Sequence, residues 1–179
     1  MFVPDTLSIT MKKHKLHFRH WTPQNHRDLV SAGSSLSSMR VVALDVLARM
    51  GRGVHLISGP LTSGGLGDFE SNKRVFVAGI EHLILEEGLH VFSQMPFEAG
   101  MRQFHTVWEQ QVGTNKYCWP ILHEFYEALF ASGRLGTVHF LHGFESSTGA
   151  RWEYEQCAKF GINTRMLSRQ FSKQLLEKA

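Results

Sequence analysis

Between residues 54 and 167, short apolar runs alternate with longer amphipathic stretches, and glycines end most of the longer ones. Short runs of Val, Ile, Leu and Phe are typical of buried strands, and the longer stretches have the period of helices. We expect strands at 54–58, 89–95, 137–141 and 162–167, helices at 68–88, 119–131, 149–160 and 168–178, and an irregular stretch around Trp108 and Tyr117. This alternation predicts an α/β fold, in which a sheet of four or five parallel strands carries helices on both faces.

The first 52 residues have a different pattern. Residues 12–20 are basic and rich in His, and their alternation of apolar and charged side chains indicates a short edge strand. The polar stretch 22–38 is typical of a loop, whereas apolar residues at helical spacing predict a helix over 36–50. We therefore expect an N-terminal extension over residues 1–52 (a basic segment plus a helix) and one α/β domain over residues 53–179.

Composition narrows the class of protein. Hydrophobic residues make up 42% of the chain and charged residues 20%, which is ordinary for a folded globular domain. The net charge of +3 suits an anionic ligand, but the basic run is too short to predict nucleic-acid binding. No apolar run approaches the roughly 18 residues of a membrane span. The two cysteines lack Cys-x-x-Cys spacing, so we expect reduced thiols in a cytoplasmic protein, with no metal site and no cofactor.

Two polar loops follow expected strands of this sheet. In open parallel sheets, ligands bind beyond the carboxyl ends of the strands, where glycines let backbone N–H groups approach an anion and a helix N-terminus favours negative charge. The candidate binding residues are Ser58, Gly59, Pro60, Ser63, Gly64 and Gly65 in the first loop, and Gly143, Ser147, Thr148 and Gly149 in the second. The alternatives are a flexible connection for the first loop and simple N-capping by Ser147 or Thr148 for the second.

Glu153 is the candidate catalytic residue. It lies about one turn into the helix that follows the second loop, from where it can face the same crevice. Cys157 and Gly161 follow at spacings of four, so small residues share its helix face and allow close packing on the sheet. A carboxylate on a close-packed face is unusual unless it is paired or functional. The alternative is a solvated surface carboxylate.

Two motifs in this order resemble the nucleoside 2-deoxyribosyltransferase-like superfamily, over residues 54–167. The first is Ile57-Ser58-Gly59-Pro60, followed by Asn72, Phe76, Gly88 and Val91, and the second is Leu141-x-Gly143-Phe144-Glu145-x-Ser147-x-Gly149-Ala150-x-x-Glu153, followed by Gly161. The superfamily includes deoxyribosyltransferases, 2′-deoxynucleoside 5′-phosphate N-hydrolases and CMP N-glycosidases. Membership would imply a flavodoxin-like (Rossmann-like) three-layer sandwich and action on the N-glycosidic bond of a nucleoside or nucleoside monophosphate.

The resemblance also implies roles for individual residues. Glu153 matches the nucleophile of the family, Ser147 matches the residue that binds a 5′-phosphate, and the first loop wraps the same ligand. The family usually has an Asp where this chain has Gly136, and for a second family Asp the stand-ins are Glu124 or Glu127. The resemblance to the family and the presence of 13 Phe and 4 Trp in a short chain together predict a homodimer or larger assembly.

Two functions remain open from the sequence. The first is hydrolysis or transfer at an N-glycosidic bond, which requires a carboxylate beneath C1′ and a second group, from Glu98, Glu124, Glu127 or Glu145, that helps the base to leave. The alternative is a nucleotide-binding sensor on the same fold with little or no catalysis. Retention of Glu153 favours the enzyme, and the missing Asp residues favour the sensor.

Overall fold

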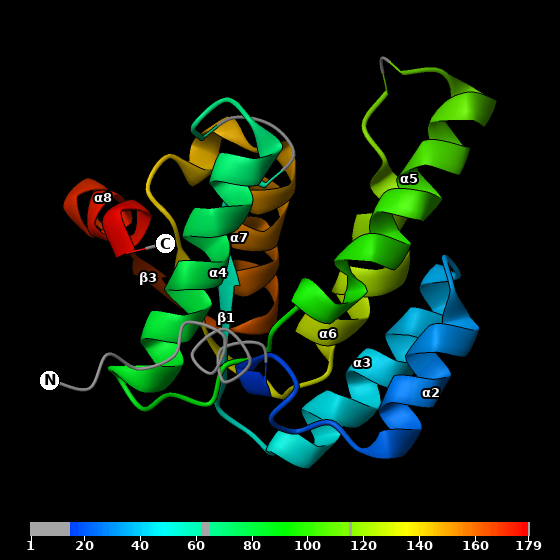
Figure 1. The fold of residues 1–179 in the computed structure, drawn as a ribbon, viewed down its shortest axis with the longest axis horizontal. Coiled ribbons are helices and arrows are strands. Elements are labelled where there is room, and N and C mark those ends of the chain that lie inside the picture. Colours follow the sequence, from blue (N-terminus) through cyan, green and yellow to red (C-terminus); the bar gives the residue numbers. More distant parts are fainter. Residues whose placement is uncertain (1–14, 62–64, 115, 179) are drawn as a thin grey trace, which may run out of the picture.

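The computed structural model describes residues 15–61, 65–114 and 116–178 (Figure 1). Three strands, β1 (Val54–Ser58), β2 (Leu135–Phe140) and β3 (Asn163–Met166), form a parallel sheet in the order β1-β2-β3. The predicted α/β class with a parallel sheet is confirmed, and the layout is compatible with a Rossmann-like fold. No helix within the described residues is long and apolar enough to cross a membrane.

The sheet has three strands where four or five were expected. The difference lies at 89–95, which pairs with β1 only through a parallel bridge between Val91 and His55. Gln94 then places its side-chain Nε2 on the carbonyl oxygen of Ile57 at 2.9 Å, where a strand would place a backbone N–H. The chain turns away into a 3-10 helix, η1 (Met95–Phe97), which contains a proline that cannot donate to the ladder.

Helices cover both faces of the sheet. They are α2 (Pro23–Ala32), α3 (Leu36–Met50), α4 (Phe69–Leu85), α5 (Glu98–Val112), the π-helical η2 (Ile121–Tyr126) continued by α6 (Glu127–Ala131), α7 (Thr148–Phe160) and α8 (Arg169–Lys178), with a 3-10 turn η3 (Phe144–Ser146) before α7. Side chains alternate across β1, so that Leu56 joins one hydrophobic cluster, with α3, α6 and α7, whereas Ile57 joins a second, with α4 and α8.

Three segments differ from their expected structure. The polar stretch expected as a loop contains α2, because Thr22 and Asn25 form a capping box and Pro23 occupies the first turn. The described part of the expected edge strand, residues 15–20, is a helical turn. The stretch expected to be irregular contains α5, an amphipathic helix in which Met101 is the one buried residue.

Helix α3 belongs to the same core as the sheet. Its buried residues Met39, Ala43 and Leu47 lie in one hydrophobic cluster with Leu56 of β1 and Val138 of β2. In Figure 1, α2 and α3 lie side by side next to α5 and α6. The boundary predicted after residue 52 therefore separates two segments that share a hydrophobic core.

Gly136 gives a test of the packing at the amino end of the sheet. A Cβ on Gly136 would lie 2.8 Å from the Cα of Gly53, so Gly136→Ala must displace backbone and should cost about 1–3 kcal/mol of unfolding free energy. Gly79→Ala is the matched control, because its Cβ would meet the ends of side chains and no backbone, most closely Ile57 Cδ1, and alanine gains roughly 1 kcal/mol of helix propensity. Urea unfolding that shows equal stability for the two variants would contradict this packing.

Candidate functional site

Glu153 and Ser58 meet at the carboxyl end of β1. Ser58 is the last residue of β1 and Glu153 lies in α7, which follows β2, so the parallel pairing of β1 and β2 brings the two residues to one edge of the sheet. The Ser58 hydroxyl donates a hydrogen bond to Oε2 of Glu153. Only 1% of Ser58 and 7% of Glu153 is exposed. The expected position of Glu153 on a packed helix face, turned toward the first loop, is what the structure has.

Burial controls the charge of Glu153. Removal of the carboxyl group from water raises the pKa of Glu153 to about 7, and the hydrogen bond from Ser58 opposes part of that rise. Ser58 occupies one carboxylate oxygen, and no other described residue donates a hydrogen bond to the second oxygen. A carboxyl group of this kind changes its charge near neutral pH and keeps one oxygen for a ligand.

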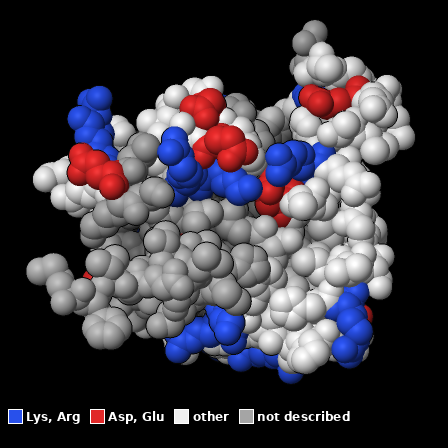
Figure 2. Space-filling model, viewed as in Figure 1, with Lys and Arg blue, Asp and Glu red and all other residues white. Residues whose placement is uncertain are grey.

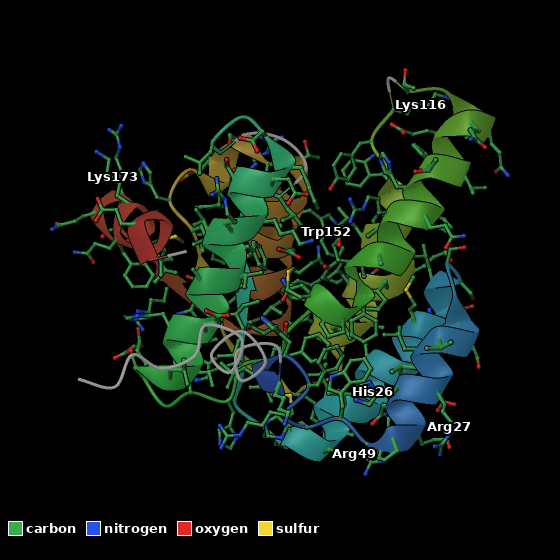
Figure 3. All side chains as sticks on the ribbon, viewed as in Figure 1. His26, Arg27, Arg49, Lys116, Trp152 and Lys173 are labelled. Carbon is green, nitrogen blue, oxygen red and sulfur yellow. The ribbon has the colours of Figure 1, made fainter. Side chains whose placement is uncertain are left out.

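The other side of α7 holds the helix in place. Trp152 precedes Glu153 in α7 and is buried (Figure 3). Its ring centre lies 6.0 Å from that of Phe130 in α6, edge-on, and 5.7 Å from that of His123 in η2. Ser147 caps the N-terminus of the helix by accepting a hydrogen bond from Ala150 N at 3.4 Å. These contacts fix the direction in which Glu153 points.

Glu153 lines a pocket of about 220 Å³. Among the predicted site residues, Gly59, Ser147 and Gly149 line the same pocket, together with Glu153 itself. Residues that the sequence analysis did not assign complete the wall, most notably Tyr117, Tyr126 and Gln94. The pocket thus has a buried carboxylate on one side and aromatic hydroxyl groups on another.

Tyr117 and Tyr126 supply hydroxyl groups near Glu153. The hydroxyl oxygen of Tyr117 lies 2.6 Å from the position that a Cβ on Gly149 would take, so glycine at 149 allows this close approach. Burial, reinforced by the charge of Glu153, raises the pKa of Tyr117 to about 12 and raises the pKa of Tyr126 well above its usual value. Both side chains therefore keep their protons at neutral pH and can donate hydrogen bonds into the pocket.

Gln94 and Glu98 add hydrogen-bond acceptors to the pocket wall. Gln94 is fixed through its Nε2 by Ile57, and its buried Oε1 has no partner among the described residues. Glu98 is held by Arg102 at 2.8 Å and by Lys73 at 3.5 Å. Gln94 follows the bridge to β1, and Glu98 is the first residue of α5. The positions of both side chains therefore depend on the turn at η1, where the chain leaves the sheet.

The structure does not bring Glu124 and Glu127 to this pocket. Glu124 is exposed, and Glu127 pairs with Lys159 at 2.9 Å on the far side of α7. The core-facing positions of this segment are taken by Leu122 and Phe125, which leaves both carboxylates on the outer face. Neither residue lines this pocket, where Glu98 is the second carboxylate on the described wall, and their role as second catalytic acids stays a prediction.

The two predicted loops do converge. The backbone N–H of Gly65 donates to the Ser146 hydroxyl at 3.1 Å, and this bond joins the first loop to the second. Pro60, Gly65 and Gly143 line a separate cavity beside the pocket of Glu153, and Thr148 accepts a hydrogen bond from Arg151 at 3.3 Å. Ser63 and Gly64 lie outside the described residues.

No group of three or more His, Cys, Asp or Glu side chains within the described ranges is arranged to hold a metal ion, and Cys118 and Cys157 are free, buried thiols. Comparisons with models of protein families, with curated proteins and with solved structures give no match to this chain. The function must therefore be argued from the site itself.

The raised pKa of Glu153 predicts that the free energy of unfolding changes with pH, and this change can be measured without a substrate. The folded protein binds this proton more tightly than the unfolded chain, so the associated stability is present below about pH 4.5 and is lost as the pH rises through 7. We expect Glu153→Gln to gain up to roughly 3 kcal/mol over the parent between about pH 5 and pH 8, since one pKa unit is worth about 1.4 kcal/mol.

Chemical unfolding at several pH values measures this difference. Glu155→Gln is the matched control, because Glu155 lies in the same helix but is exposed, and its effect should not change with pH. A constant difference between Glu153→Gln and the parent over this range would show that Glu153 is not a buried, titrating carboxyl group.

Proposed function

We propose that the protein cleaves the N-glycosidic bond of a nucleoside or nucleoside 5′-monophosphate, with Glu153 as the attacking carboxylate. The observation that carries this proposal is the buried carboxyl group of Glu153, which is oriented by Ser58, has a pKa of about 7 and faces a pocket at the carboxyl ends of the strands. Such a position for a carboxylate costs stability and is typical of catalytic groups.

The chemistry follows from one oriented carboxylate oxygen. Cleavage of an N-glycoside passes through an oxocarbenium-like transition state, and an ionised carboxylate beneath C1′ stabilises that charge and bonds to C1′ as the bond to the base breaks. The bonding electrons leave with the nitrogen of the base. Water, or a second base in a transferase, then attacks C1′ and releases Glu153 as a carboxylate, and the proton that the nucleophile loses balances the one that the first base takes up.

The leaving base needs a proton or strong hydrogen bonds. The pocket wall has both hydrogen-bond donors and hydrogen-bond acceptors. The hydroxyl groups of Tyr117 and Tyr126 stay protonated and can donate to a ring nitrogen or a carbonyl oxygen of the base. Glu98 and Gln94 Oε1 are acceptors for an amino or imino group. Of these four groups, the two tyrosines alone carry a proton that they can give, so they take the place of the acids sought at Glu124 and Glu127.

The resemblance to the nucleoside 2-deoxyribosyltransferase-like superfamily agrees with this reading, and with it the flavodoxin-like three-layer fold. The chain departs from the family at Gly136, where an Asp is usual. Gly136 lies near the amino end of β2 against Gly53, at the opposite end of the strand from the pocket. A side chain at position 136 could not reach Glu153.

A nucleotide-binding sensor on the same fold is the second candidate. It is favoured by the missing Asp residues of the family, because position 136 is Gly and neither Glu124 nor Glu127 lines the pocket. Turnover separates the two functions, because a sensor would bind the same nucleotides without releasing free base. Nucleic-acid binding is less favoured, because basic side chains fall into separate groups on the face in Figure 2, several of them beside acidic ones.

We expect the purified chain to release free base from at least one member of a panel of ribo- and deoxynucleosides and their 5′-monophosphates. Because Glu153 must be ionised to attack, kcat/KM should rise with pH through about 7. Glu153→Gln should lower kcat by several powers of ten, roughly 10³-fold or more, whereas Glu155→Gln should leave kcat unchanged.

Chromatography of the released base, with binding followed separately by calorimetry, decides between the candidates. A Glu153→Gln variant that keeps parental turnover would remove Glu153 as the nucleophile. Binding of a nucleotide without release of base from any panel member would favour the sensor instead.

A further inference from the structure

A second cavity, of about 590 Å³, lies beside the pocket of Glu153. Consecutive residues of the two loops line the two spaces: Gly59 lines the pocket and Pro60 the cavity, while Ser147 lines the pocket and Ser146 the cavity. The loops therefore form a common wall, which the hydrogen bond from Gly65 to Ser146 ties together. The size of the cavity is within the usual range for small-molecule sites.

Helix α8 gives this cavity a basic rim. Arg169 and Lys173 both line it and are four residues apart on α8, so they lie on one side of the helix. Neither side chain forms an ion pair with any carboxylate in the described part of the chain. Glu145 is the single acidic residue on the described wall, and it is exposed to water. The rim therefore carries a net positive charge that no described protein group neutralises.

A buried hydroxyl group lies between the two cations. Ser172 lines the cavity, and its Oγ is buried without a hydrogen-bond partner in the described residues. A buried polar group without a partner is costly, so an acceptor in the cavity would satisfy it. The cavity lining also has apolar side chains, among them Leu66, Val75 and Leu141.

We propose that this cavity binds a small organic phosphate. Arg169 and Lys173 hold the phosphate through charge-assisted hydrogen bonds, Ser172 donates a third, and the apolar side chains receive the organic part of the molecule. This site differs from the phosphate position that the resemblance implies at Ser147, because it is built from α8 and lies on the other side of the loops. It does not depend on catalysis by Glu153.

Calorimetric titration of the full chain with inorganic pyrophosphate tests the site. We expect binding that weakens about tenfold or more in Lys173→Gln and in Arg169→Gln, because each removes one charge-assisted contact. Arg27→Gln is the matched control: it removes the same charge from the exposed face of α2, and Arg27 lies at the opposite end of the molecule from Lys173 in Figure 3.

Two results would overturn the proposal. One is the absence of pyrophosphate binding by the parent at millimolar concentration, and the other is equal weakening by Arg27→Gln and the two α8 substitutions. Circular dichroism of each variant shows that the fold is kept. Because the probe has no glycosidic bond, pyrophosphate binding without nucleoside cleavage would reject the proposed function while this site stands.

The source of the phosphate is identified by a second titration, with adenosine and uridine 5′-diphosphates. If one molecule spans the pocket and the cavity, Tyr117→Ala in the pocket and Lys173→Gln in the cavity should both weaken its binding. If a separate effector occupies the cavity, Lys173→Gln alone should weaken it. Either result supports the cavity as a phosphate site, and diphosphate binding that Lys173→Gln leaves unchanged contradicts it.

Discussion

The hydrogen bond from Ser58 to the buried carboxyl group of Glu153 is the interaction on which the candidate site depends. It joins the end of β1 to the first turns of α7, two segments far apart in sequence that the parallel β1–β2 pairing brings to one edge of the sheet. Burial makes the charge of Glu153 expensive, and the Ser58 hydroxyl lowers only part of that cost. The site therefore holds a group whose protonation changes near neutral pH.

Contacts around Glu153 hold its helix and the wall of its pocket in place. Trp152 fixes α7 from its other side, and the glycine at 149 lets the Tyr117 hydroxyl approach the start of the helix. Removal from water raises the pKa of the tyrosines that share the pocket with Glu153, as it raises the pKa of Glu153 itself. One desolvated pocket thus holds both a carboxyl group and hydroxyl donors, the two kinds of group that the proposed cleavage requires.

Sequence reasoning was most successful where the hydrophobic period was strong. β1, β2 and α7 are close to their expected ranges, and Glu153 lies where the small residues on its helix face indicated. It failed at α5, an amphipathic helix that buries little, and at Tyr117, which reaches the pocket from outside the regular elements. Glu124 and Glu127 were named only as stand-ins for an Asp of the family, and no period of the sequence indicated the π-helical η2, with Glu127 N bonded to Leu122 O, that surrounds them.

The central claim is that Glu153 attacks the anomeric carbon, and its most direct test is capture of the intermediate. The protein would be quenched in acid during turnover of an accepted nucleoside or monophosphate, digested, and examined by mass spectrometry. The account predicts a peptide that contains Glu153 and carries the mass of the sugar or sugar phosphate, absent from Glu153→Gln. Turnover with the adduct on another residue, or no turnover of any panel member, would contradict it.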